Sequence, residues 1–403
     1  MKARPCMQII DKKRVGTLFL LTCMLVTIFF AYGERENLGK IDIFHFVLPF
    51  VPLYLILGVT AVMFVYALLS RGKRIDIVCL LLIARMVLHC IPLLYTGFHP
   101  KFAVNFVTSG LCLAFYYAGL NFSEDKRFLL RVLKAIFLLI ALQTAIEAVI
   151  SPASFFGDTY VYKNQLMLPF GGSNAIAAIL IPCYAFIFCA EKKWAWCIAD
   201  TVILLLAVGL TKSRGGLIVA VLAICLALFF RLGISLKWIP IFLGGGVAAA
   251  ALLLTVLMIT PFGRYIFLNS SSTVDARFAL WERHLRFFLE QPIFGYGFSE
   301  ETVTLNPHNF FVHILSRSGV VGLLLFSVLV AFVFCKLVGA LHDRYVKAGI
   351  AFLVTMACHS LVEVVLFSYH YDMIFWFILG GTVMRAERIK KEKEEPLRLS
   401  DDR

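Results

Sequence analysis

The stretch of residues 305–323, LNPHNFFVHILSRSGVVGL, places polar side chains directly before an apolar run. Pro307 and Asn309 are residue types that favour the start of a helix, so this corner could be a helix cap and nothing more. An imidazole also takes up a proton near neutral pH, which makes His308 a candidate general base. His313, one turn further on, is expected to be a packed helix residue.

Basic side chains gather at two other places. Lys212 and Arg214 lie in LTKSRGGL, a tight turn between two apolar runs. Arg277, Trp281 and His284 follow at spacings that put them on one face of a helix. Guanidinium groups pair with phosphate through two parallel hydrogen bonds, so these residues indicate a phosphate-bearing substrate. The competing interpretations are side chains that snorkel at helix ends and a basic helix face that rests on anionic headgroups.

The elements that must position these residues are membrane helices. The chain of 403 residues is 61% hydrophobic and 16% charged, with a mean hydropathy of +0.87. No soluble globular domain of this size has such a composition, and runs of about 20 apolar residues recur along the chain. We therefore expect an all-α polytopic integral membrane protein that forms a single domain over residues 1–403. The expected spans, about twelve, are 15–32, 43–69, 75–95, 102–120, 130–150, 172–190, 194–211, 215–231, 238–260, 309–335, 347–368 and 371–385.

The distribution of positive charge predicts the topology. With the N-terminus inside, the inner segments carry 26 of the 38 Lys and Arg residues and the outer segments carry 11. This asymmetry follows the positive-inside rule and puts both termini in the cytoplasm, with residues 386–403 as a solvated tail. The net charge of +13 is thus a topology signal and does not indicate nucleic-acid binding. The eleven cysteines are scattered singly, without the spacing of a metal site.

Two outer segments are long, residues 151–170 and residues 261–307. The larger one, expected to be the main periplasmic loop, contains Arg264 and then the run SSTVDARFALWERHLRFFLE. This run interleaves apolar and basic residues and predicts an amphipathic helix on the membrane surface. Arg277 is expected in its first turn, where the helix dipole disfavours a cation, so something other than helix stability should account for this residue.

Three charged residues fall within the expected spans, namely Arg85, Glu147 and Glu363. Ionisable residues at membrane depth are functional candidates, and structural ion pairs are the competing explanation. We include Arg85 among the candidate substrate-binding residues.

The order of these motifs resembles the O-antigen ligase and polymerase superfamily. The shared features are SRGG at residues 213–216, Arg277 with Trp281, the run PIFGYG at residues 292–297, HNF at residues 308–310, and Gly319 with Gly322. Each motif is weak alone, but their order and their common side of the membrane make the match specific over residues 210–326.

The resemblance implies a membrane-integral, GT-C-like glycosyltransferase of the bacterial inner membrane with a periplasmic active site. Such enzymes move a glycan from undecaprenyl diphosphate to an acceptor hydroxyl, with inversion and without metal or other cofactor. The acceptor is a second lipid-linked glycan or the lipid A core, and a chain-length regulator and a flippase are the expected protein partners. The family's catalytic residues carry over onto Arg214, Arg277 and His308. Lys212, Arg264, Trp281, His284, Asn309 and Arg85 are then the candidates for binding the diphosphate or the sugar.

Four functions remain open at this level. A polymerase is favoured, because only ten residues separate Gly297 from His308 and ligases often carry longer insertions there. A ligase that transfers the polymer to the lipid A core shares the mechanism, as does a transferase acting on another surface glycan. A twelve-span secondary transporter is the alternative from another class, but the paired half repeats that it would show are absent from the sequence.

Overall fold

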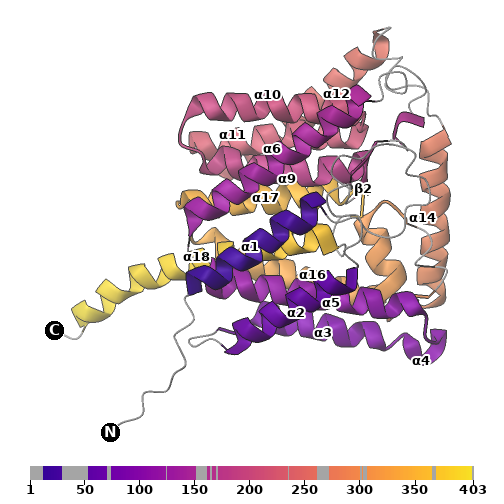
Figure 1. Ribbon diagram of the computed structural model, residues 1–403, viewed down its shortest axis with the longest axis horizontal. Coiled ribbons are helices and arrows are strands. Elements are labelled where there is room, and N and C mark those ends of the chain that lie inside the picture. Colours follow the sequence, from indigo (N-terminus) through magenta and orange to yellow (C-terminus); the bar gives the residue numbers. More distant parts are fainter. Residues whose placement is uncertain are drawn as a thin grey trace.

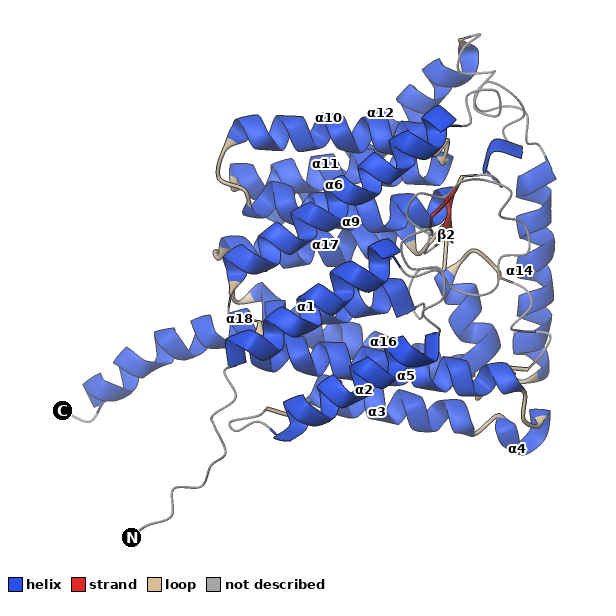
Figure 2. Cartoon of the chain, in the orientation of Figure 1, coloured by secondary structure: helices blue, strands red, loops and turns tan. Residues whose placement is uncertain are grey.

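The computed structural model of the protein describes residues 12–29, 53–69, 74–123, 125–150, 161–163, 166–168, 171–234, 236–260, 272–299, 302, 306–364 and 369–401. Nearly all of these residues are helical (Figure 2). The first helices are α1 (Lys12–Phe29), α2 (Leu53–Leu69), α3 (Ile77–Cys90), α4 (Leu93–Thr96), α5 (Pro100–Phe122) and α6 (Lys126–Ile150). After the strands β1 (Met167–Leu168) and β2 (Gly171–Gly172) come α9 (Ser173–Ala190), α10 (Trp194–Leu210), α11 (Arg214–Leu232), η1 (Leu236–Trp238), α12 (Ile239–Ile259), α14 (Ser272–Glu290), α16 (Phe310–Val338), α17 (Arg344–His359) and α18 (Tyr369–Asp401).

The apolar helices agree with an all-α membrane protein. Among the described residues, five helical segments are long and apolar enough to cross a bilayer, and three shorter apolar helices accompany them. Each of the twelve predicted spans overlaps a helix, but length and hydropathy support five of them, so the count of twelve stays a prediction. The predicted span over residues 75–95 consists of α3 and α4, which a short turn at Ile91 and Pro92 joins.

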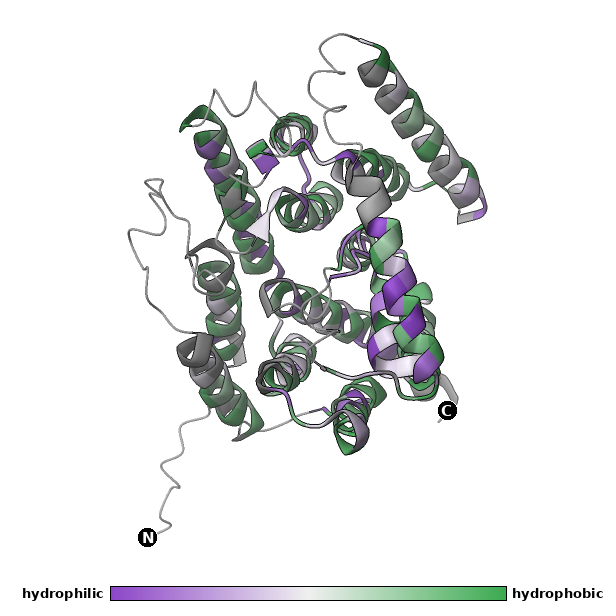
Figure 3. Cartoon of the chain, turned by 90° about the vertical axis from the view of Figure 1, so that its right-hand side faces the viewer, coloured by the Kyte–Doolittle hydropathy of each residue, from purple (hydrophilic) through white to green (hydrophobic). Residues whose placement is uncertain are grey.

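Most helices run alongside one another, and α14 lies across one end of this bundle (Figure 1). The C-terminal end of α18 lies at the opposite end (Figure 1). Figure 3 shows α14 in front of bundle helices seen end-on, with both hydrophilic and hydrophobic residues along its length. The predicted amphipathic helix is therefore present, and it begins at Ser272. Arg277 consequently lies in the second turn, so the helix-dipole argument for this residue is wrong.

The most extensive helix packing joins α5 to α18 and α9 to α17. A Cβ atom at Gly119 would lie 2.2 Å from the carbonyl oxygen of Phe377, and one at Gly380 would lie 2.2 Å from that of Tyr116. These two glycines thus allow the backbones of α5 and α18 to touch. Close backbone approach is how membrane helices gain packing energy, since lipid tails remove the hydrophobic drive between them.

Two helices depart from the expected pattern. The backbone of α16 is non-helical at Gly319, with φ 61° and ψ −162°, so the helix is kinked there. The last helix, α18, continues to Asp401, so the segment predicted as a solvated tail is helical as far as that residue.

Candidate functional site

His308 lies immediately before α16, in a corner that other segments hold in place. The side chain of Asn309 caps the helix by accepting hydrogen bonds from the backbone N–H groups of Phe311 and Val312, at 3.0 and 3.2 Å. The indole Nε1–H of Trp281 donates to the Pro307 carbonyl at 2.6 Å. Asn309 is therefore the helix cap that the sequence predicts, and His308 is not needed for that purpose.

The imidazole of His308 pairs with Glu363. Its Nδ1 atom lies 2.8 Å from Glu363 Oε1, and the two side chains are 33% and 12% exposed. Glu363 belongs to the turn after α17, because that helix ends at His359. The predicted span over residues 347–368 therefore ends earlier than expected, and Glu363 faces the same corner as His308.

The protonation of this pair follows from the surroundings of the carboxylate. Burial raises the pKa of Glu363, but hydrogen bonds from His308 and Asn174 and the nearby positive charges lower it by more, so the pKa lies below its ordinary value. An ionised carboxylate only accepts hydrogen bonds, so Nδ1 of His308 carries the proton that it donates to Glu363. In the neutral ring, Nε2 is then the acceptor, as a general base requires.

Hydrogen bonds connect this pair to the start of two other helices. Asn174, near the start of α9, donates to Glu363 Oε2 at 3.1 Å. Ser213 Oγ donates to Asn174 Oδ1 at 2.7 Å, and it caps α11 by accepting from the Gly216 N–H at 3.1 Å. The segment SRGG thus reaches His308 through two side chains that lie far from it in the sequence.

Four cationic side chains surround the same region. Burial lowers the pKa of the Lys163 ammonium, and three neighbouring cations lower it further, to about 8. These neighbours are Arg214, Arg277 and Lys212. Lys212 is fully buried, and its Nζ lies 4.8 Å from the ring centroid of Tyr162. We call Lys163, Lys212, Arg214 and Arg277 the cationic cluster. Glu363 lies beside it and Glu147 acts electrostatically on Tyr162, so four cations face two carboxylates and the cluster is positive overall.

Arg277 is held directly against the turn that carries Glu363. Its NH1 group donates to the carbonyl of Val362 at 3.0 Å. A Cβ atom at Gly215 would lie 3.0 Å from Cγ2 of Val362, so α11 packs closely on the same turn. The small residue after Arg214 therefore serves helix packing, and the turn that carries Glu363 contacts both α11 and Arg277.

Backbone strain coincides with the candidate site. Among the described residues, Lys212 and His308 are the two non-glycine residues with a left-handed backbone, at φ 51° and 50°. Side chains other than glycine rarely adopt this conformation, and such strain concentrates at functional sites. For His308 the strain is partly offset, because Asn306 Oδ1 accepts its backbone N–H at 2.9 Å.

The other predicted site residues take different positions. His284 is fully buried, and its Nδ1 lies 2.8 Å from Ser316 Oγ on α16. Together with the bond from Trp281 to Pro307, this contact fastens α14 to the segment that carries His308. Arg85 lies elsewhere, in a cavity between α3 and α16. Arg264 lies outside the described residues.

The glycine motifs form a backbone clasp. The kink at Gly319 allows the run at residues 292–297 to dock on α16 through four backbone bonds: Tyr296 N–H to Ser316 O (2.8 Å), Gly297 N–H to Arg317 O (3.0 Å), Val320 N–H to Pro292 O (2.9 Å) and Val321 N–H to Ile293 O (3.2 Å). Gly295 and Gly319 have φ 70° and 61°, and a Cβ atom on either would overlap the opposite backbone at 2.4 and 2.3 Å. The clasp explains why this motif and the Gly319–Gly322 pair occur together.

Lys163 and Asn174 belong to the site but were not predicted from the sequence. A lysine on the predicted outer side of the membrane, within the loop of residues 151–170, was the signal available for Lys163. Asn174 gave none, because a polar residue at the start of an apolar run is common at helix ends. Within the described ranges, no three His, Cys, Asp or Glu side chains come together as a metal site requires.

Comparison with known families covers the middle of the chain. Residues 199–327 match the family model described as O-antigen ligase. This range contains Lys212, Arg214, Arg277 and His308, whereas Glu363 lies beyond it. No curated protein matches the chain in a sequence comparison. The match over residues 199–327 supports the predicted resemblance to the O-antigen ligase and polymerase superfamily of membrane proteins.

Proposed function

We propose that the protein is a membrane glycosyltransferase that moves a glycan from undecaprenyl diphosphate to an acceptor hydroxyl on the periplasmic face. The observation that carries the proposal is the pairing of His308 with Glu363, at 2.8 Å, beside the cationic cluster. A base held by a carboxylate and an anion-binding group of cations are the two parts that such a transfer needs. The inner-membrane location and the periplasmic site belong to this proposal.

The proposed reaction is a single displacement. The acceptor oxygen forms a bond to the anomeric carbon, and the bond from that carbon to the bridging phosphate oxygen breaks. The acceptor proton passes to Nε2 of His308, and Glu363 stabilises the imidazolium that results. The glycosylated acceptor and undecaprenyl diphosphate leave. In-line attack inverts the anomeric centre, and the step needs neither a nucleotide sugar nor a redox cofactor.

The cationic cluster supports departure of the leaving group. Negative charge grows on the diphosphate as the glycosidic bond breaks, and cations already fixed in place stabilise it without reorganisation. Arg214 and Arg277 are suited to bidentate contact with phosphate oxygens, and Lys163 and Lys212 add point charges. Losing one such group typically costs about 3 kcal/mol of transition-state stabilisation.

Polymerase is the favoured form of this activity. The segment between Gly297 and His308 is short, so little chain is available there to build a pocket for a large core oligosaccharide. The ligase is the second candidate, since the matched family carries that description. Both activities use the same donor and the same base, and they differ in the acceptor.

A lipopolysaccharide gel of the source strain with the gene deleted tests the proposal. Complementation compares the wild type, His308→Ala and a control, His342→Ala, in which the exposed histidine lies in the turn between α16 and α17. Cores capped with a single repeat unit support the polymerase, and bare cores with polymer left on the lipid carrier support the ligase. An unchanged ladder on deletion rejects both for lipopolysaccharide. Full complementation by His308→Ala rejects the base assigned here.

A further inference from the structure

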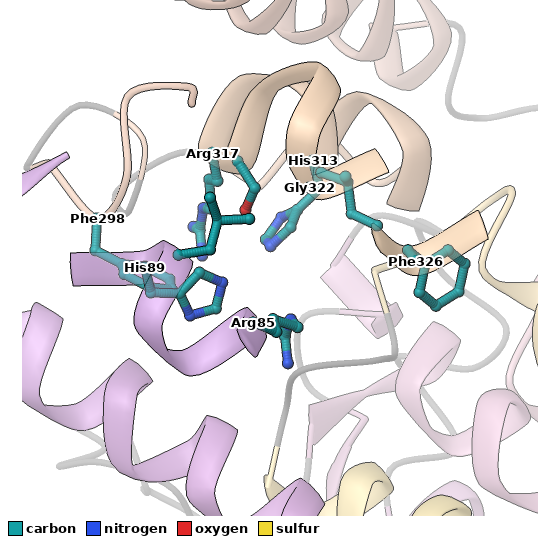
Figure 4. Close-up of a pocket in the computed structure, with 10 residues that line it drawn as sticks. Arg85, His89, Phe298, His313, Arg317, Gly322 and Phe326 are labelled. Atoms are coloured by element: carbon teal, nitrogen blue, oxygen red, sulfur yellow. The ribbon is translucent and has the colours of Figure 1, made fainter. Parts of the chain in front are cut away.

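A second group of basic side chains faces a cavity between α3 and α16 (Figure 4). From α3 come Arg85 and His89, and from the first half of α16 come His313 and Arg317. Their side chains point toward one another in Figure 4. None of these four residues belongs to the cationic cluster, and the proposed transfer reaction does not use them.

The charge of this cavity is not balanced. The guanidinium groups of Arg85 and Arg317 are close enough to repel each other electrostatically. Asp372 of α18 acts on Arg85 and compensates one charge, but no acidic residue is found among the described residues that line the cavity. Burying a cation without a counter-ion is costly at membrane depth, so the excess positive charge indicates an anionic ligand.

Two polar atoms at the cavity lack hydrogen-bond partners. They are Nδ1 of His313, a residue that is 9% exposed, and Nε of Arg317. Arg317 donates from NH2 to the Thr302 carbonyl at 2.7 Å, so its side chain is fixed while Nε stays available. Buried polar groups in native proteins are nearly always hydrogen-bonded, and a bound anion would satisfy both of these atoms.

The backbone clasp fixes one wall of the cavity. Phe298 directly follows the clasped run, and its ring lies 4.9 Å from the His89 ring and 5.2 Å from the Arg317 guanidinium carbon. Ser109 Oγ lies 3.2 Å from Nδ1 of His89 and holds that ring from the other side. The basic groups are therefore held in position before a ligand arrives.

The helices that form the cavity are also suited to contact lipid. Val87 on α3 is 60% exposed, and Leu324 on α16 is 59% exposed. The cavity between these helices opens to the exterior. The volume of the cavity is about 20 Å³, room for about one water molecule, so a phosphate group binds with most of its volume in the open mouth, against the fixed basic groups.

We infer that this cavity is a second phosphate-binding site, formed by Arg85, His89, His313 and Arg317, and that it holds a phosphate of the acceptor lipid. The assignment to an acceptor rests on the proposed function. A polymerase has the simplest use for such a site, because its donor and its acceptor both carry a lipid diphosphate. One molecule would place its diphosphate in the cationic cluster and the other would place its phosphate here.

Binding stoichiometry tests the site without measuring transfer. The full chain in nanodiscs of neutral lipid is titrated with farnesyl diphosphate and, separately, with inorganic pyrophosphate. The wild type is expected to bind two farnesyl diphosphate molecules. Arg317→Gln should weaken one of them at least tenfold and leave the other, whereas the Arg214→Gln, Arg277→Gln double variant should do the reverse. Arg317→Lys keeps the charge and should still bind two farnesyl diphosphate molecules. The control Arg283→Gln, on the exposed face of α14, should also bind two.

The opposite results are equally definite. If the wild type shows a single binding event, and neither Arg317→Gln nor Arg85→Gln changes it, the second phosphate-binding site is rejected. Equal affinity of the second site for pyrophosphate and farnesyl diphosphate overturns the lipid assignment, because a free anion would then suffice. Two binding events in a protein that transfers no glycan would uphold the phosphate site and reject the acceptor role. Thermal unfolding of each variant separates loss of the ligand from loss of the fold.

Discussion

Nδ1 of His308 and Oε1 of Glu363 lie 2.8 Å apart, although 55 residues separate them in the chain. His308 precedes α16 and Glu363 follows α17, so the pair links the start of α16 to the turn after α17. Asn174 and Arg277 reach the same turn from α9 and α14. A base, its orienting carboxylate and an arginine thus come from separate elements that converge at one end of the bundle.

Glu363→Gln is expected to lower kcat by about 10- to 100-fold and to leave the KM for the lipid-linked donor almost unchanged. The amide retains a hydrogen bond to His308 but no longer stabilises the imidazolium, and loss of such a supporting partner typically costs that factor. Release of undecaprenyl diphosphate from a defined donor in proteoliposomes gives both constants. Glu282→Gln, an exposed carboxylate on α14, is the control. A rise in KM alone would assign Glu363 to substrate binding.

Arg277→Lys should reduce kcat/KM for the donor by at least tenfold. Lysine keeps the charge but lacks the planar guanidinium group. That group lets Arg277 pair with phosphate and donate to the Val362 carbonyl at the same time. The matched substitution is Arg283→Lys, on the exposed side of the same helix, which should have no effect. Equal activity of the two variants would mean that only the charge of Arg277 matters.

The pKa of Lys163 predicts that binding of the donor weakens at alkaline pH. The pKa of Lys163 is about 8, so its side chain is a charged ammonium below that pH and loses its charge as the pH rises through this value. Binding that requires the charged form then weakens by about tenfold per pH unit above 8. Measured as kcat/KM between pH 7 and 10, this decline should move to higher pH in Lys163→Arg.

Lys163→Gln should instead lower kcat/KM by about tenfold at pH 7, because one charge-assisted contact to phosphate is lost. It should also remove the decline above pH 8. A wild-type decline that persists in both variants would place the titrating group elsewhere.

Gly319→Ala should destabilise the protein by about 2 kcal/mol or more. The glycine has φ 61°, and a Cβ atom would lie 2.3 Å from the Ile293 carbonyl oxygen, so the clasp must open. The readout is the unfolding temperature in detergent. Gly339→Ala is the matched control at the C-cap of the same helix, since Gly339 has φ −66° and open space around its Cβ position. Similar unfolding temperatures for the two variants would show that the clasp contributes little to stability.

Local signals in the sequence determined several features correctly. Hydropathy located the apolar helices, and the alternation of basic and apolar residues located α14, because both patterns repeat within a few turns of one helix. The cap at Asn309 was equally readable, since a cap depends on residues two or three positions away. The family resemblance over residues 210–326 rested on the same kind of short-range motif, and the match over residues 199–327 agrees with it.

Tertiary structure alone decided which of these residues meet. Lys163, Asn174 and Glu363 join the site because helices far apart in sequence pack against one another, and no local pattern encodes that packing. The same packing separates Arg85 from the cationic cluster and places it with His313 and Arg317. Helix formation depends on the hydropathy and the caps of each segment, whereas the site depends on which helix ends lie side by side. One such place is the continuous chain of hydrogen bonds that leads from Ser213 through Asn174 and Glu363 to His308.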